Sequence, residues 1–397
     1  MNILIVSAVF PPEPVVSSKL SEDLALELSK EHMVTVICPK PTRPYGFVFT
    51  NNEKVIGSYQ RIVLDSYTCP KSTIFGRIKE SYSFGKASYK YIKNNEKKID
   101  CIYMNTWPIF GQYFVKKAAI KSKIPYVIHI QDVYPESLAN KVPFFGRFIS
   151  LIFRPFDAKI LRKANQVIAI SEKMKNYLHQ TRSVPFSKIS VVLNWQNEAH
   201  FMDLDINNSD EANVFTFMYL GNVGPIAGCD LLISAFSDSN LDKSRLVIAG
   251  SGSMRESLKL QVKDLGINNV EFWDVPDGEV PKIQAKAVVM LLPIKKGAAS
   301  SSIPSKLPAY MFSAKPIIAA VDSDSDTANA IREAGCGWVI EPEKPEILAK
   351  LIKEVQELPK SELITMGLKG REYALKHFSK MNNLSKLVGV IEKILKQ

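Results

Sequence analysis

Short apolar runs alternate with amphipathic stretches along the first 200 residues of the chain. After the first run, Leu20, Leu24 and Leu28 recur at helical spacing, and Ser17 or Ser18 precedes them as the expected helix cap. Apolar runs without strict alternation, separated by helices, are typical of a parallel sheet covered on both faces. The runs that predict strands are NILIVSAVF from Asn2, MVTVIC from Met33, CIYMNTW from Cys101, YVIHIQD from Tyr126, QVIAIS from Gln166 and KISVVLN from Lys188.

A second series of the same kind fills the other half of the chain. Its runs are FTFMYLG from Phe215, SRLVIAGSG from Ser244, NVEFWDV from Asn269, AVVMLLP from Ala287, KPIIAAV from Lys315 and GWVIEP from Gly337. The polar segment at 203–213 predicts a linker, and single cores rarely exceed about 250–300 residues. We therefore expect an α/β fold of two doubly wound Rossmann-like domains facing a central cleft, residues 1–202 and 203–379. The segment 380–397 is expected to be an amphipathic helix that joins the first domain, with Leu384, Leu387, Val388, Ile391 and Leu395 on one face.

The cysteines and the apolar segments bear on the compartment. The five cysteines are scattered and free of CxxC spacing, which disfavours a disulfide framework or a zinc site and fits a reducing cytoplasm. The opening MNILIVSAVFPP lacks a basic region before its apolar run, so it predicts a buried strand in place of a signal peptide. No segment reaches the roughly 18 apolar residues of a membrane span. We expect a cytoplasmic protein.

All the excess of positive charge lies in the first half. The whole chain carries a net charge of +11. Residues 1–200 hold 28 lysines and arginines against 15 acidic residues, a net of +13, while residues 201–397 hold 23 against 25, a net of −2. Nucleic acid, anionic lipid and phosphorylated lipid are the candidate partners of such a surface. A merely solvated basic face has the same composition.

Two turns after predicted strands of the second half carry glycines suited to an anion. Gly221 and Gly224 follow the first of these strands, and Gly250 and Gly252 follow the second. Glycines let backbone N–H groups approach a phosphate, and the following helix adds its dipole. Ordinary turns between a strand and a helix also contain glycines, so this pattern alone leaves both interpretations open.

The stretch SSSIPSKLPAYMFSAKP, residues 300–316, is a third candidate at a strand end. Ser305 is the predicted N-cap of a helix, and Lys306 and Pro308 lie in its first turn, where proline is tolerated. A helix N-terminus beside a lysine suits a diphosphate. The alternative is an ordinary capped helix with a solvated lysine.

Polar residues also end a strand of the first half, in YVIHIQDVYPESL. His129 can donate or accept a hydrogen bond near neutral pH, and Asp132 and Glu136 could accept hydrogen bonds from ligand hydroxyls. A lone histidine is more often a buried residue with satisfied hydrogen bonds. No serine nucleophile elbow is present in the sequence, so hydrolase chemistry is unsupported.

Two stretches interleave aromatic and basic residues, at 75–98 and 142–163. Such helices can lie in the plane of a membrane interface, and core packing against the sheet is the alternative. The residues concerned are Phe75, Tyr82, Phe84, Tyr89 and Tyr91 in the first stretch, and Phe144, Phe145, Phe148, Ile152 and Phe153 with Arg147 and Arg154 in the second.

Together these segments resemble the retaining glycosyltransferases of family 4, which have the GT-B fold. The resemblance covers nearly the whole chain and is greatest for the bacterial O-antigen and capsule transferases of the N-acetyl-L-fucosamine type. The segments that carry it are FPPEPVVSSKLSEDLALELSKEHMVTVIC, LRKANQVIAISEKMKNYL, VLNW, YLGNVGPIAGCDLLISAF and PSKLPAYMFSAKPIIA.

The resemblance implies a UDP-sugar donor in the second domain and a lipid-diphosphate-linked sugar acceptor in the first. It implies transfer with retention and no metal or other cofactor, at the inner face of the plasma membrane, which the protein would bind peripherally through its basic first domain; nucleic acid is not an expected partner. The catalytic residues it implies are His129, Asp132 and Lys306; the donor-binding residues are Gly221, Asn222, Gly224, Gly250, Gly252, Val275, Lys295, Ser301, Ser302, Ile303, Pro304, Ser305 and Leu307; the acceptor-side residues are Val16, Ser17 and Glu136.

The chain departs from the family pattern at two pairs of positions. Members often carry two glutamates where Ser301 and Ala309 stand, and the second of these usually binds the ribose. They often carry an arginine and a lysine where Asn222 and Ala227 stand. The resemblance then assigns phosphate binding to Lys306, the preceding serines, and Lys295 or Lys296.

Two other functions are compatible with the same fold. A sugar-nucleotide epimerase would share both domains but act without an acceptor, and the basic first half disfavours it. A non-catalytic partner subunit is suggested by the missing glutamates and cations. Conversion of a nucleotide-sugar without an acceptor would indicate the first, and binding without transfer would indicate the second.

Overall fold

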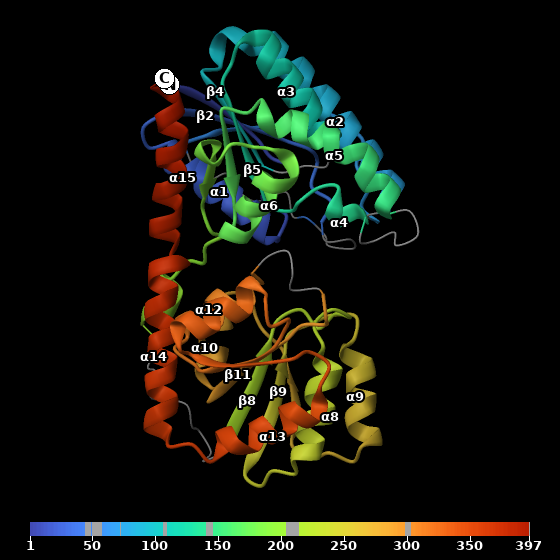
Figure 1. The fold of residues 1–397 in the computed structure, drawn as a ribbon, viewed down its shortest axis with the longest axis vertical. Coiled ribbons are helices and arrows are strands. Elements are labelled where there is room, and N and C mark those ends of the chain that lie inside the picture. Colours follow the sequence, from blue (N-terminus) through green and yellow to red (C-terminus); the bar gives the residue numbers. More distant parts are fainter. Residues whose placement is uncertain are drawn as a thin grey trace. The chain divides into compact units, whose positions relative to one another are not determined.

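The computed structural model describes residues 1–43, 49, 58–71, 73–105, 109–139, 146–203, 214–297 and 303–396, with the side chain of Arg147 excluded. These residues form two units, one of residues 1–194 with 383–397 and one of residues 195–382 (Figure 1). Each unit is an α/β structure built on one parallel sheet, as the alternation of apolar runs predicts.

The first unit contains a seven-stranded parallel sheet. Its strand order is β3-β2-β1-β4-β5-β6-β7, so the direction of winding reverses between β1 and β4. In open α/β sheets, ligands bind beyond the carboxyl ends of the strands at such a reversal. The strands are β1 (Asn2–Val6), β2 (Met33–Cys38), β3 (Gln60–Val63), β4 (Cys101–Asn105), β5 (Tyr126–Ile130), β6 (Gln166–Ala169) and β7 (Ile189–Val191).

Helices of the first unit bury apolar side chains against this sheet. Phe84, Val115, Ile160 and Met174 come from four different helices and share one core cluster with strand residues. The helices described between residues 1 and 203 are α1 (Val16–Leu28), α2 (Ile74–Asn95), α3 (Phe110–Ser122), α4 (Glu136–Ala139), α5 (Gly146–Arg162), α6 (Glu172–Arg182) and α7 (Ala199–Met202), of which α7 belongs to the second unit.

The second unit contains a six-stranded parallel sheet of order β10-β9-β8-β11-β12-β13. Here the winding reverses between β8 and β11, so this unit also has a binding position at the carboxyl ends of its central strands. The strands are β8 (Phe215–Leu220), β9 (Ser244–Ala249), β10 (Val270–Trp273), β11 (Val289–Pro293), β12 (Ile317–Ala320) and β13 (Gly337–Ile340).

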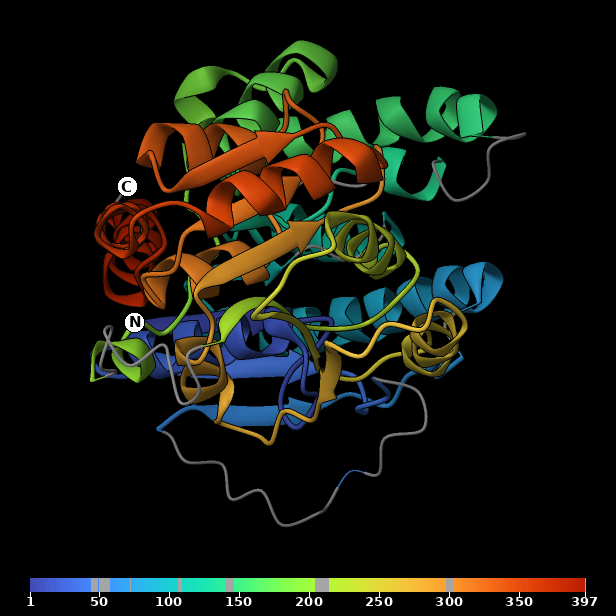
Figure 2. The ribbon, with the colours of Figure 1, turned by 90° about the horizontal axis from the view of Figure 1, so that it is seen from below.

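The helices of the second unit include two that pack side by side, α8 and α13 (Figures 1 and 2). Leu232 of α8 and Ile352 of α13 meet Phe217 of β8 in one core cluster. The helices described after residue 214 are α8 (Cys229–Ser239), α9 (Arg255–Asp264), α10 (Val280–Ala285), α11 (Lys306–Phe312), α12 (Asp326–Ala334), α13 (Pro345–Gln356), α14 (Lys360–His377) and α15 (Lys380–Leu395).

The last helix, α15, belongs to the first unit from Asn383 onward. It buries Leu384, Leu387 and Ile391 as the pattern predicts, whereas Val388 and Leu395 are only partly buried and Ile394 is buried. Within the described residues, no helix combines the length and the apolar composition needed to cross a bilayer.

Two predicted helix caps are wrong. Helix α1 begins at Val16 and not after Ser17 or Ser18, and no side chain caps it. Ser305 stands at the N-cap position of α11, but its backbone is already helical and its side chain forms no cap hydrogen bond. A capping side chain that accepts from the first helical turn typically belongs to a residue with extended backbone.

Candidate active site

The turns after β8 and β9 run against each other at the carboxyl edge of the second sheet. The amide of Gly221 donates to Ala249 O at 3.0 Å, and that of Val223 donates to Ser251 O at 2.8 Å. A Cβ on Gly250 would overlap Gly221 O, and one on Gly252 would overlap Val223 O. Both glycines are therefore required by the close approach of two backbones, whether or not a ligand binds.

Lys306 lies beside the first of these turns. Its side chain passes the Cα of Gly221, and its amine lies 5.4 Å from the ring centre of Tyr219. Burial lowers the pKa of the Lys306 amine, an effect that the nearby Cys229 thiol partly opposes. The predicted catalytic lysine is thus brought together with the predicted glycine turn, Gly221 to Gly224.

Tyr310 of α11 fixes the residue that precedes the Gly221 turn. The buried Tyr310 hydroxyl accepts from Leu220 N at 2.9 Å and donates to Leu220 O at 2.8 Å. The hydroxyl of Tyr219 donates to Asn222 O at 2.7 Å. Neither tyrosine was predicted to position the site, because both lie in apolar runs that indicate only core packing.

The remaining predicted donor residues are placed around this edge. Ile303 and Pro304 precede α11, Leu307 is buried in it, and Leu307 N donates to Pro304 O at 3.0 Å. Val275 follows β10 and is half-buried. Ser301 and Ser302 lie outside the described residues, so their predicted role has no structural account.

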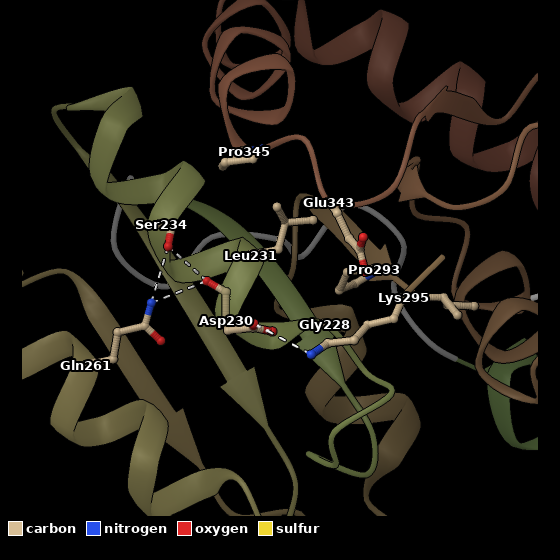
Figure 3. A pocket seen from close by; sticks show the side chains of 10 residues that line it. Gly228, Asp230, Leu231, Ser234, Gln261, Pro293, Lys295, Glu343 and Pro345 are labelled. Atoms are coloured by element: carbon tan, nitrogen blue, oxygen red, sulfur yellow. Dashed lines mark hydrogen bonds and ion pairs between the residues drawn. The ribbon is translucent and has the colours of Figure 1, made fainter. Parts of the chain in front are cut away.

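Lys295 lines a pocket of about 330 Å³ on the side of α8 and α13 (Figure 3). Its amine lies 3.9 Å from a carboxylate oxygen of Asp230, and its backbone N–H donates to Ile226 O at 3.2 Å. Lys295 is therefore a neighbour of Ala227, the position at which the family resemblance predicts a lysine. Lys306 is not among the residues that line this pocket, which are Gly228, Asp230, Leu231, Ser234, Gln261, Pro293, Ile294, Lys295, Glu343 and Pro345.

In the first unit, the predicted catalytic histidine is buried at the end of β5. The imidazole of His129 is only 1% exposed, and burial lowers its pKa to about 3. Its Nδ1 lies 2.6 Å from the Tyr103 hydroxyl, and its Nε2 lies 3.0 Å from Gln131 Nε2. His129 is therefore neutral at physiological pH, and Gln131 is a half-buried neighbour that sequence reasoning missed.

Asp132 and Glu136 differ in their surroundings. Asp132 is exposed, whereas Glu136 accepts from Arg182 at 2.5 Å, from Arg154 at 3.0 Å and from the Tyr177 hydroxyl at 2.8 Å. Burial raises the pKa of Glu136, but hydrogen bonds from Arg182 and Tyr177 outweigh it and lower the pKa overall. Glu136 therefore has a structural role, since it binds two arginines and a tyrosine. Its role in binding the acceptor stays a prediction.

The turn after β1 is closed by small polar side chains. Ser7 and Ser21 lie 3.0 Å apart through their hydroxyl oxygens, and Asn105 Nδ2 donates to Ser21 Oγ at 3.1 Å. Val16 is half exposed at the first position of α1, and Ser17 is partly buried beside it. The two predicted acceptor-side residues thus lie near the reversal between β1 and β4.

The aromatic and basic stretches divide between core and surface. Phe84, Tyr89, Tyr91 and Phe153 pack in or against the core, as the alternative predicts. The exposed members are Phe75 and Tyr82 of α2 and Phe148 and Ile152 of α5, which Leu151 joins. Phe144, Phe145 and the Arg147 side chain lie outside the described residues.

One trio of metal-ligating types meets among the described residues. Single ligand atoms of Glu31, His32 and Glu392 lie within 4.8 Å of one another. The trio joins the segment before β2 to α15, away from the carboxyl ends of the strands. None of the predicted site residues belongs to it.

Comparisons with known proteins also divide the chain into two parts, near the boundary between the two units at residues 194 and 195. Residues 19–197 match the family model Glycosyltransferase Family 4, and residues 204–367 match the model Glycosyl transferases group 1. The chain is similar to the probable glycosyltransferase WbjE of Pseudomonas aeruginosa, 24% identical over 284 residues that cover 68% of this chain and 69% of the relative.

Two further relatives span nearly the full length. The putative colanic acid biosynthesis glycosyl transferase WcaI of Escherichia coli K12 is 24% identical over 98% of this chain and 100% of its own. The crystal structure of Anabaena HepE in complex with UDP aligns with a TM-score of 0.72 at 16% identity, covering 99% of this chain and 100% of that one. The two parallel-sheet units match such structures, and the chain is a glycosyltransferase of the GT-B fold.

Proposed function

We propose that the protein transfers a sugar, with retention and without a metal, from a UDP-sugar to a lipid-diphosphate-linked saccharide during synthesis of a surface polysaccharide. The observation that carries this proposal is that the Lys306 side chain lies against the Gly221 turn, at the carboxyl edge of the second sheet. A cation next to a glycine turn and a helix start is suited to a sugar-nucleotide diphosphate.

The chemistry asked of Lys306 is stabilisation of a leaving group. As the glycosidic bond loosens toward an oxocarbenium ion, negative charge develops on the departing diphosphate, and a preorganised ammonium group lowers the energy of that state. Burial makes such a charge more effective, because the local dielectric is lower than that of water. The departing phosphate can accept the proton of the attacking hydroxyl, so no separate base is required.

Lys295 is the best-supported replacement for the lysine absent at Ala227. The backbone N–H of Lys295 donates to Ile226 O, so the residue lies next to position 227, and its amine lies near Asp230 at the start of α8. Its contact with Asp230 is long, at 3.9 Å, and both side chains are about half exposed. A weak exposed ion pair of this kind is easily exchanged for a phosphate.

The names of similar proteins favour the donor and the pathway class. HepE has been solved with UDP and with UDP-glucose, and WcaI is named for colanic acid biosynthesis. A UDP-sugar donor and a polysaccharide product follow by analogy. N-acetyl-L-fucosamine is the proposed sugar on the branch resemblance alone.

Helix α5 supports an acceptor held at a lipid surface. Phe148, Leu151 and Ile152 are 62%, 74% and 50% exposed, and their spacing of three and four residues places them on one stripe of the helix. The surrounding half of the chain has an excess of basic residues, which favours an anionic bilayer. We propose peripheral binding to the inner face of the plasma membrane, where a lipid-linked acceptor is available.

Titration calorimetry with UDP and a panel of UDP-sugars, followed by transfer to a lipid-diphosphate-linked sugar, tests the proposal. Lys306→Met keeps the aliphatic stem and removes the charge, and it should lower turnover at least about a hundredfold, as loss of a transition-state charge contact does. Lys350→Met is the control, since Lys350 is 81% exposed on α13. Unchanged transfer in Lys306→Met, or epimer formation without acceptor, contradicts the proposal.

A further inference from the structure

A chain of hydrogen-bonding groups connects two strand ends in the first unit. It begins at Tyr103 of β4, passes through His129 at the end of β5 and reaches Gln131 just beyond that strand. Asn194, which follows β7, completes it by donating from Nδ2 to Gln131 Oε1 at 2.8 Å. No contact in this chain joins two charged groups.

The direction of the chain follows from its two amides. Because Asn194 donates to Gln131 Oε1, the NH₂ group of Gln131 is the end that faces His129. A nitrogen that faces a donor must accept, so His129 Nε2 carries no proton. The proton of a neutral imidazole then sits on Nδ1, which faces the Tyr103 hydroxyl at 2.6 Å.

Because these hydrogen-bonded groups are largely buried, the direction of their hydrogen bonds is difficult to reverse. His129 and Tyr103 are 1% and 2% exposed, so water cannot exchange readily for either partner. The Oδ1 of Asn194 is also buried and lacks a hydrogen-bond partner among the described groups. A buried imidazole is held in one tautomer by the donors and acceptors that face its ring nitrogens, and Gln131 is one of these groups.

We propose that Gln131, oriented by Asn194, is a positioning residue that holds His129 as the neutral tautomer protonated on Nδ1. The role in catalysis rests on the proposed transferase function and on the catalytic role that the family resemblance implies for His129. Gln131 then fixes which ring nitrogen is a donor, and hence the hydrogen-bonding pattern at the end of β5, where the half-buried Gln131 lies next to the exposed Asp132.

Asn194→Asp tests the direction of these hydrogen bonds without changing a residue that contacts the imidazole. A carboxylate only accepts, so Gln131 must turn its NH₂ group toward residue 194 and its carbonyl toward His129. The imidazole proton should move to Nε2, with Tyr103 now donating to Nδ1. Long-range ¹⁵N–¹H spectra of histidine-labelled protein at neutral pH report the position of the proton directly, without any ligand.

Asn197→Asp is the matched control. Asn197 Nδ2 lies 3.1 Å from His200 Nε2 in an exposed amide–imidazole pair. This variant should shift the signals of His200 and leave those of His129 unchanged. A wild-type proton on Nε2, or an Asn194→Asp variant with the wild-type tautomer, overturns the assignment.

Gln131→Met measures the contribution to turnover. Loss of the amide should lower kcat roughly tenfold, the effect of one hydrogen bond, with little change in the KM for the donor. If the tautomer behaves as expected but Gln131→Met transfers at the wild-type rate, the amide is structural and the positioning role is wrong. If the wild-type protein transfers no sugar, the proposed function fails, and the spectra still decide the tautomer.

Discussion

The side chain of Lys306 occupies the space that a Cβ at position 221 would need. A methyl group there would overlap Lys306 Cε, with Cδ at 2.9 Å and the amine at 3.3 Å. The glycine after β8 is therefore explained by a neighbouring side chain in the unliganded protein. The close approach of a phosphate, which the sequence pattern suggests, would be a different reason for a glycine at position 221.

Gly221→Ala should displace the lysine and weaken donor binding. We expect at least a tenfold loss of UDP affinity and a destabilisation of about 1–3 kcal/mol from overpacking. Calorimetry and thermal unfolding measure the two effects. Gly389→Ala on α15 is the control, because its Cβ would meet no atom within 4 Å and Gly389 is not among the predicted site residues. Equal affinities in both variants would remove Gly221 from this account.

Tyr310→Phe should loosen the same turn from the other side. The lost hydroxyl leaves the N–H and C=O of Leu220 without their buried partner, at a cost of about 1–3 kcal/mol. The expected result is a lower melting temperature together with weaker UDP binding. Tyr373→Phe removes an exposed bond to Glu333 and should change neither quantity appreciably. A normal UDP affinity in Tyr310→Phe would show that the turn does not depend on it.

Arg182→Met should be severely destabilising. The guanidinium is fully buried between Glu136 and Asp157, at 2.5 Å and 2.8 Å, so its loss leaves two carboxylates without their cation. Breaking a buried pair in this way costs about 3–5 kcal/mol. Burial raises the pKa of Asp157 to about 6 even beside Arg182, so part of the loss should be recovered as Asp157 protonates in mild acid. Chemical denaturation at two pH values measures both effects.

Glu136→Gln separates structure from acceptor binding. The amide keeps its size and can still accept from Tyr177, so we expect a smaller loss of stability than in Arg182→Met. If Glu136 contacts the acceptor, the KM for the lipid-linked sugar should rise while the affinity for UDP stays constant. A change in stability alone assigns Glu136 to the ion network.

His129 should make the fold sensitive to acid. Its folded-state pKa of about 3 lies below the ordinary value, so the unfolded chain binds a proton that the folded chain does not. The stabilisation is complete above about pH 6.5 and is lost as the pH falls toward 3. His129→Gln cannot titrate, so the difference in unfolding free energy between wild type and variant should shrink with acidification. A constant difference would mean that His129 is accessible to protons in the folded state.

The sequence predicts the strands better than it predicts the contacts between them. Buried runs such as the one from Tyr126 are recognisable because both faces of a parallel strand are apolar. Strand β3 was missed because it is an edge strand of four residues, none of them fully buried. The partners of Glu136 could not be foreseen, because Arg182 is 46 residues away and only tertiary packing brings them together. Lys306 was predicted because it lies in a recognisable motif. The hydrogen bonds of Tyr310 to Leu220 were not, because those residues are 90 positions apart.

The exposed stripe of α5 gives a cleaner test of membrane binding than its arginines do. Arg154 pairs with Glu136, so reversing its charge would place a carboxylate against a carboxylate and disturb the fold. Phe148→Glu with Leu151→Glu changes only exposed positions and should abolish sedimentation with vesicles of anionic lipid. Leu260→Glu on α9, 61% exposed in the other unit, is the control and should still sediment. If the double variant binds as the wild type does, charge alone or another surface holds the protein at the membrane. High salt then distinguishes those two outcomes, because electrostatic attraction is screened and apolar insertion is not.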